Sequence, residues 1–197
     1  MEAGHCSASI EKKPSLDPEK TENFRPICRL LFFAKVAEVH VIDQLMNFIE
    51  AEDLLHETQL GFHPEFSTEW AFLLASESLR QIVDGGKTAA LFIPDLSAAF
   101  DTVSQGLLLE RLYNNGVGES ALLRIASFLQ KHTIQVVQQP FFPEAVLLQP
   151  GVPLGSTLSP TLSNLYMHPF VDFIECHRFN IVSYVDDTQL IITLSQD

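Results

Sequence analysis

Apolar residues recur three and four positions apart in several stretches of the chain, which is the spacing of one helix face. Between Ala34 and Leu55 this face is formed by Ile42, Leu45, Met46 and Ile49. The same period predicts four more helices: Trp70–Val83, Leu107–Asn114, Ser120–Gln130 and Leu158–Phe173. For the first of these we expect Ser67 as N-cap, Glu69 in the first turn, and an apolar face through Phe72, Leu79 and Val83.

Three other stretches have the pattern of strands. The continuous apolar run Ala89–Ile93 predicts a strand buried on both faces, although the Pro94 that follows is unexpected in a central strand. Short β-branched runs on both sides of Asp186-Asp187 predict a hairpin, and Thr133–Val137 with Ala145–Leu148 predicts another. Because helices and strands alternate while hairpins recur, the expected fold class is α+β with a largely antiparallel sheet.

Composition narrows the class of protein. The chain has 197 residues, 46% of them hydrophobic, which is enough for a substantial core. Residues 1–22 are polar and contain Pro14 and Pro18, so we expect a disordered leader there. The formal charge of -13 is unfavourable for binding a polyanion, so we expect weak binding of nucleic acid unless a metal or a partner adds positive charge.

The cysteines and the hydropathy pattern indicate the compartment. Cys6, Cys28 and Cys176 are odd in number and show no C-x-x-C spacing, so neither a disulfide framework nor a zinc site is expected. No run approaches the ~20 apolar residues that span a bilayer. We expect an intracellular protein, nuclear or cytoplasmic, with no membrane segment.

The candidate chemistry lies in carboxylates at strand ends. Asp186 and Asp187 are adjacent, and Asp95 follows the apolar run Ala89–Ile93. If these strands are neighbours, the three carboxylates meet at one sheet edge, where they could share two Mg²⁺ or Mn²⁺ ions about 4 Å apart. The alternative for the Asp pair is an ordinary solvated turn, in which Asp is common.

Five motifs in order resemble the reverse transcriptase domain of non-LTR (LINE-type) retrotransposons. The first catalytic motif is matched by Ala90–Val103 and the second by Tyr184-Val185-Asp186-Asp187. The remaining three matches are Phe24-Arg25-Pro26-Ile27, Gly61-Phe62 with Ser67-Thr68-Glu69, and Gly151–Ser156 with Leu158-Ser159-Pro160 and Asn164-Leu165-Tyr166.

This resemblance implies a fingers-and-palm fragment that carries out two-metal nucleotidyl transfer. It places a fingers-like helical segment at residues 23–87 and a palm-like segment with an interleaved fingers hairpin at 88–197, ending before the family's thumb. It implies an RNA template, a DNA primer and dNTP as partners.

The resemblance also implies a role for each matched site residue. Asp95 and Asp186 would hold the metals and Asp187 would assist. The nucleotide-binding positions would be Phe100, Arg25, Gly155, Leu154 and His63, with Phe100 beneath the incoming sugar. Asp101, Gly151 and Pro153 would be structural. From the residues alone, Asp101 could instead be the N-cap of the next helix.

Three positions depart from the family pattern. His63 stands where the family has Arg, Leu154 replaces a Gln, and Pro94 replaces an aliphatic residue. A neutral His is a poor substitute for the fixed positive charge of Arg. These departures leave two alternatives open: a catalytically inactive retrotransposon remnant, or a protein-interaction module. A two-metal nuclease or phosphatase ranks last, since no His or Glu stands beside Asp95 or Asp186.

Overall fold

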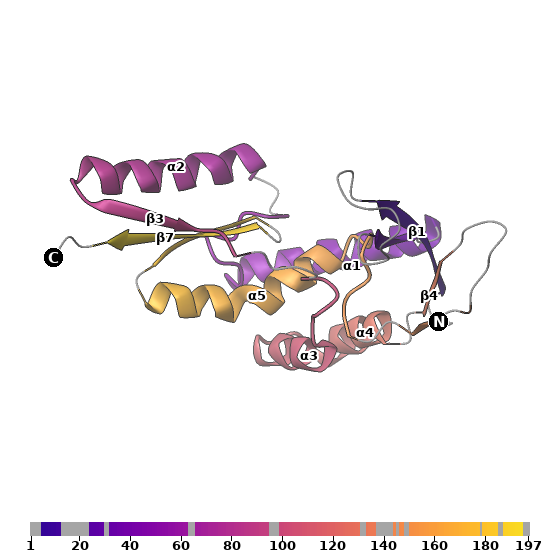
Figure 1. The fold of residues 1–197 in the computed structure, drawn as a ribbon. Coiled ribbons are helices and arrows are strands. Elements are labelled where there is room, and N and C mark those ends of the chain that lie inside the picture. The colour runs from indigo at the N-terminus through magenta and orange to yellow at the C-terminus, as the bar shows by residue number, and fades with distance from the viewer. Residues whose placement is uncertain are drawn as a thin grey trace. The chain divides into compact units, whose positions relative to one another are not determined.

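The computed structural model describes residues 5–12, 24–29, 32–62, 66–94, 99–130, 133–136, 144, 146–147, 150–177, 179–184 and 187–194. The chain divides into two compact units (Figure 1). Unit 1 contains residues 1–47 and 100–163, and unit 2 contains residues 48–99 and 164–197. The predicted division at residue 87 into fingers and palm remains a prediction.

Unit 1 contains a four-stranded sheet in the order β2-β1-β4-β5. β1 (His5–Lys12) pairs antiparallel with β2 (Phe24–Arg29) and parallel with β4 (Thr133–Val136), and β4 pairs antiparallel with the short β5 (Val146–Leu147). The β4–β5 hairpin confirms the sequence prediction. Residues 5–12 form a strand in the segment that was expected to be disordered, because β1 obtains backbone partners on both sides.

The helices of unit 1 follow the predicted apolar periods. They are the first part of α1 (Phe32–Ala51), α3 (Gln105–Asn114), α4 (Glu119–Leu129) and the first turn of α5 (Ser159–Cys176). α3 and α4 each bury two apolar side chains, four positions apart: Leu108 and Leu112, and Ile125 and Leu129. These spacings place each pair on one helix face.

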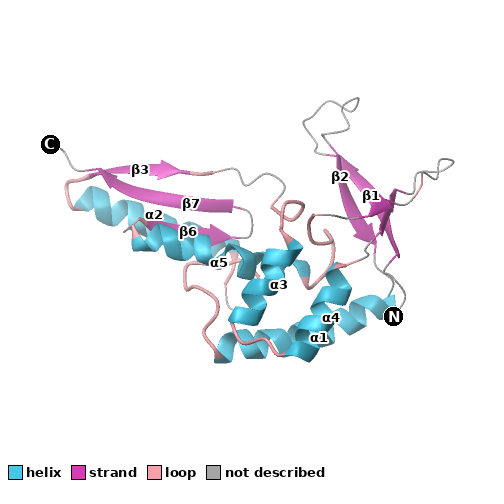
Figure 2. Cartoon of the chain, turned by 90° about the horizontal axis from the view of Figure 1, so that it is seen from below, coloured by secondary structure: helices cyan, strands magenta, loops and turns pink. Residues whose placement is uncertain are grey.

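Unit 2 is a three-stranded antiparallel sheet between two helices. Its order is β3 (Thr88–Phe92), β7 (Asp187–Leu194), β6 (Asn180–Tyr184), and the β6–β7 hairpin confirms the prediction (Figure 2). Successive strand residues face opposite sides. One face therefore packs on α2 (Thr68–Asp84), and the other packs on α5. The α2 side contains Ala71, Ala75, Val182 and Ile191, and the α5 side contains Val171, Ile174, Ile181 and Leu190.

Two expectations about unit 2 were wrong. β3 was expected to be buried on both faces, but its residues Leu91 and Phe92 are 45% and 56% exposed. It is also an edge strand of this sheet. An edge position tolerates the following Pro94, since one side of the strand needs no ladder donor. In α2, Leu79 packs against the core as expected, but Phe72 and Val83 are exposed. The face that approaches the sheet is formed by the small residues Ala71 and Ala75.

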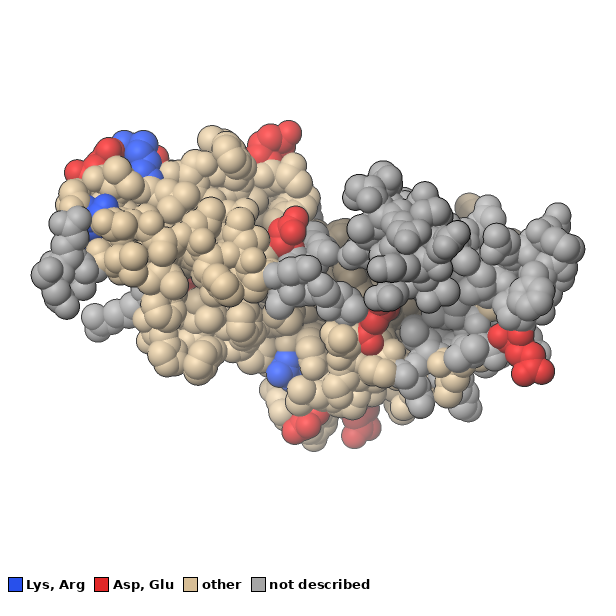
Figure 3. All heavy atoms as spheres, viewed as in Figure 1, with Lys and Arg blue, Asp and Glu red and all other residues tan. Residues whose placement is uncertain are grey.

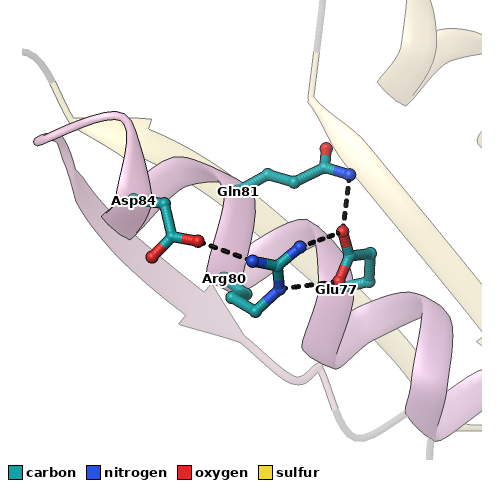
Figure 4. A network of polar contacts seen from close by, with 4 residues as sticks. All are labelled: Glu77, Arg80, Gln81 and Asp84. Carbon is teal, nitrogen blue, oxygen red and sulfur yellow. Dashed lines mark hydrogen bonds and ion pairs between the residues drawn. The ribbon is translucent and has the colours of Figure 1, made fainter.

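Charged side chains on the exposed side of α2 form a chain of contacts. Arg80 donates to both carboxylate oxygens of Glu77, at 2.8 and 2.7 Å, and to Asp84 at 2.6 Å (Figure 4). Gln81 also donates to Glu77, at 2.9 Å. The hydrogen bonds from Arg80 and then from Gln81 lower the pKa of Glu77 from 4.5 to about 2.

We expect this network to stabilise α2 in a pH-dependent way. Because the folded pKa of Glu77 lies below its ordinary value, its contribution is complete above pH 4.5 and is lost as the pH falls toward about 2. An NMR titration should place the Glu77 midpoint well below 4.5, and Arg80→Gln should move it back toward 4.5. Arg124→Gln on α4 is the matched control and should leave it unchanged. A wild-type midpoint near 4.5 would contradict the network.

Candidate active site

The described flanks of the three predicted carboxylates lie at one end of the unit 2 sheet. Phe92, at the end of β3, pairs with Leu190 of β7, and Tyr184, at the end of β6, pairs with Asp187, the first residue of β7. The ends of β3 and β6 therefore lie at the same end of the sheet as the start of β7. This is the arrangement that the strand-end argument required.

Of the three carboxylates, Asp187 is described and exposed. Asp95 and Asp186 lie outside the described residues: Asp95 follows the end of β3 by three positions, and Asp186 immediately precedes β7. Their convergence remains a prediction. Among the residues that the structure does describe, no three His, Cys, Asp or Glu side chains are grouped so as to hold a metal ion.

The glycine turn Gly151–Ser156 lies in unit 1 and packs against the turn that contains Phe100. Gly151 donates its N–H to the Val103 carbonyl at 3.0 Å, and Val152 donates to the Phe100 carbonyl at 2.8 Å. The Gln105 amide donates to the Gly151 carbonyl at 2.8 Å. Two motifs about fifty residues apart in sequence are thus joined by backbone contacts.

Gly151 is required here both by its backbone angle and by space. Its φ is +114°, and a Cβ on it would lie 3.0 Å from the Asp101 Cα and from the carbonyl oxygens of Asp101 and Phe100. Pro153 is buried, and its carbonyl accepts from the Ser156 N–H at 3.2 Å and the Ser159 hydroxyl at 2.9 Å. These contacts support the structural role expected for both residues.

The other sequence-predicted residues are placed as follows. Phe100 is half-buried and Asp101 is exposed, and the N-cap of α3 is Ser104, whose hydroxyl accepts from the Leu107 N–H. The interpretation of Asp101 as that N-cap was therefore wrong. Leu154 is half-buried and Gly155 is exposed, with φ +104°. Arg25 belongs to β2, where side chains are not described, and His63 lies outside the described residues.

One functional candidate was missed by the sequence analysis. Glu38 of α1 is only 7% exposed, and one of its oxygens accepts from the Ser156 hydroxyl, the Thr157 N–H and the Thr157 hydroxyl at 2.9, 3.0 and 2.9 Å. Its position could have indicated burial, since Glu38 precedes the buried Leu45 by seven residues and so shares its helix face.

In unit 2, Gln59 and Gly61, at the matched fingers motif, contact Asn164 of α5. The Asn164 amide donates to the Gly61 carbonyl at 2.6 Å, and the Gln59 amide donates to the Asn164 carbonyl at 3.0 Å. The Leu60 N–H also donates to the Ser183 carbonyl of β6 at 2.8 Å. These bonds give Gly61 and Asn164 a structural reason to occur together.

Two histidines in unit 2 lie close to carboxylates of α5. His56 lies 2.8 Å from Glu175, and His168 lies 3.1 Å from Asp172. The two rings are 6.3 Å apart at an edge-to-face angle. These groups join the loop after α1 to α5, and they do not form a metal site among the described side chains.

Comparison with known proteins agrees with this fold and these motifs. The model of the reverse transcriptase (RNA-dependent DNA polymerase) family matches residues 10–197. The RNA-directed DNA polymerase from the mobile element jockey of Drosophila melanogaster is 26% identical over 188 residues, which are 91% of this chain and 20% of that protein. The probable RNA-directed DNA polymerase from the Drosophila transposon X-element is 26% identical over 182 residues, again 91% and 20%.

Solved structures show the same fold at low identity. Telomerase from Candida tropicalis in complex with a fragment of telomeric RNA has a TM-score of 0.66 at 15% identity, covering 95% of this chain and 36% of that one. The apo form of that telomerase, truncated from its C-terminal domain, has a TM-score of 0.62 at 15% identity, with coverage of 94% and 43%.

The chain belongs to the reverse transcriptase family. Within that family it is a domain of the non-LTR, LINE-type retrotransposon class, as the five motifs indicated. It spans about a fifth of the length of the curated relatives that it matches. No helix among the described residues is long and apolar enough to cross a bilayer.

Proposed function

We propose that this domain catalyses RNA-templated DNA synthesis, with Asp95, Asp186 and Asp187 as the metal-binding carboxylates. The observation that supports the proposal is the register of the unit 2 sheet. This register brings the end of β3, the end of β6 and the start of β7 to one end of the sheet. Family membership supports the reaction class, and the sheet register supports the choice of residues.

The residues fit a divalent cation by their chemistry. Asp187 is exposed at the start of β7, and hard cations such as Mg²⁺ and Mn²⁺ prefer carboxylate oxygens. When bound, two such ions lower the barrier to displacement at phosphorus by stabilising the attacking and leaving oxygens. The role of Asp95, Asp186 and Asp187 is to hold negative charge at a fixed place on the sheet edge.

Selection of the nucleotide is assigned to the turn residues and to the fingers. Phe100 would lie beneath the incoming sugar, where its ring excludes a 2′-hydroxyl, and Leu154 and Gly155 would contact the new base pair. Arg25 would lie near the triphosphate or the template. His63 would supply less fixed positive charge to the triphosphate than the Arg of the family.

The expected partners are an RNA template, a DNA primer and dNTP. The net charge of -13 opposes the binding of these negatively charged partners. Figure 3 shows few Lys or Arg side chains on the described part of the face that it views. Phosphate contacts dominate affinity for nucleic acid. We therefore expect weak binding by this chain alone, with a strong dependence on salt.

The test is primer extension with the purified chain on an RNA template at low salt, with Mg²⁺ or Mn²⁺. Extension should require the metal, the template and the dNTPs complementary to that template, and a chelator should abolish it. Lack of extension with either metal, under conditions where a known reverse transcriptase extends the same primer, would contradict the proposal.

A second candidate is a protein-interaction module without catalysis. It is favoured by the exposed apolar side chains of α2, of which Trp70, Phe72 and Leu73 are 52%, 70% and 56% exposed. Apolar groups gathered on one helix surface are typical of contact sites. Failure of primer extension together with loss of binding to a protein partner in Phe72→Ser would favour this function.

A further inference from the structure

The buried carboxylate of Glu38 has a structural task that neither the motifs nor the catalytic carboxylates explain. It comes from α1, yet its three hydrogen-bond donors all belong to Ser156 and Thr157, at the end of the glycine turn. The residues are separated by 118 positions in sequence, and all three lie in unit 1. A buried charge is costly unless donors compensate it, so these bonds act together.

The contacts of Glu38 complete a set that holds the glycine turn on both sides. Before its tip, the turn is held by the bonds of Gly151 and Val152 to the Val103 and Phe100 carbonyls. After its tip, the Ser156 hydroxyl donates to Glu38 and also accepts from the Leu158 N–H at 3.1 Å. The fixed segments therefore flank Leu154–Gly155, the two residues to which the proposed function assigns nucleotide contact.

We propose that Glu38 is a positioning residue for nucleotide selection, acting through Ser156 and Thr157 on Leu154–Gly155. This inference rests on the proposed function for its effect on the nucleotide, and on the structure for the contact itself. Glu38 does not touch the reacting atoms. It fixes the far side of the turn, so that Leu154 and Gly155 present one conformation to the base pair.

The charge of Glu38 is the feature to test. Hydrogen bonds to an ionised acceptor are roughly twice as strong as neutral ones. Glu38→Gln keeps the size of the side chain but removes the charge, and one end of the amide cannot accept. Glu38→Asp keeps the charge but shortens the reach. Glu50→Gln, an exposed site on the same helix, is the matched control.

The experiment measures single-nucleotide incorporation and amide hydrogen exchange on the same preparations. Glu38→Gln should raise the KM for dNTP about tenfold, because charge-assisted hydrogen bonds become weaker neutral ones, while kcat stays within about twofold. Exchange should become faster in the peptide over residues 151–158. Glu50→Gln should match wild type in both measurements, and Thr157→Val should reproduce part of the Glu38→Gln effect.

Other outcomes separate this inference from the proposed function. Unchanged KM in Glu38→Gln, or faster exchange spread over the whole of unit 1, would overturn the positioning role, the latter because it shows general destabilisation. If the wild-type chain does not extend a primer, the proposed function fails and the nucleotide part of the inference fails with it. In that case, faster exchange confined to 151–158 would still support Glu38 as the anchor of the turn, and unchanged exchange would refute it.

Discussion

Replacing Asp186 with Asn is expected to reduce nucleotide incorporation by a factor on the order of 10³ or more. The substitution removes one negative charge from the proposed metal site and leaves an amide oxygen, which is a weaker ligand for a hard cation. A metal ion supplies several kcal/mol of transition-state stabilisation, and about 4 kcal/mol corresponds to three orders of magnitude in rate. The measurement is the rate of primer extension at saturating dNTP.

The shape of the β6–β7 hairpin should survive this change, because Asn is as well suited as Asp to tight turns. Mn²⁺ should raise the melting temperature of wild type, and not that of Asp186→Asn. Asp43→Asn, an exposed site on α1, is the control and should retain activity. Equal incorporation by wild type and Asp186→Asn would exclude Asp186 as a ligand of the catalytic metal.

Helices and hairpins could be predicted from local pattern because their burial repeats every few residues. The Leu108–Leu112 and Ile125–Leu129 pairs follow this rule, and both lie inside the predicted ranges. The β6–β7 hairpin was predictable for a similar reason, since two short apolar runs flank a pair of turn residues.

Which face of an element is covered could not be predicted, because that depends on its neighbours. The run Ala89–Ile93 has the same composition whether the strand is central or at an edge, and β3 is at an edge. In α2 every position from Trp70 to Ala75 is apolar, so the period alone does not choose a face. The sheet is approached by Ala71 and Ala75 because small side chains allow close packing.

The polar contacts of the candidate site illustrate the same limit. The carboxylates were proposed from their positions at strand ends, and the register of β3, β7 and β6 agrees with that argument. The convergence of Asp95 and Asp186 stays a prediction, because both lie outside the described residues. The hydrogen bonds of Glu38 could not be predicted, because its partners lie more than a hundred residues away in the sequence. Asp101 was considered as a possible N-cap of α3, but Ser104 holds that place, since a sequence offers several capping residues without showing where the first turn begins.

Gly151→Ala is expected to destabilise unit 1 by about 2–6 kcal/mol, the sum of roughly 1–3 for a backbone angle outside the usual regions and 1–3 for crowding. The φ of +114° is one that side-chain-bearing residues rarely adopt, and the new Cβ would lie 3.0 Å from the backbone of Asp101 and Phe100. Neither backbone can yield easily, because the Val152 N–H binds the Phe100 carbonyl. Chemical denaturation measures the change in the free energy of unfolding. Amide hydrogen exchange of residues 99–104 then shows whether the loss is located at the contact with the glycine turn.

Substitutions at two other glycines of this chain separate the cost of the backbone angle from the cost of crowding. Gly86 has φ +71° but no atom within 4 Å of a Cβ, so Gly86→Ala should show the cost of the backbone angle alone, about 1 kcal/mol. Gly106, inside α3, has neither restriction, and Gly106→Ala should stabilise the helix by about 0.5–1 kcal/mol. If Gly151→Ala costs no more than Gly86→Ala, the glycine turn does not press on the Phe100–Val103 turn. The two turns would then be held together by their hydrogen bonds rather than by close packing at Gly151.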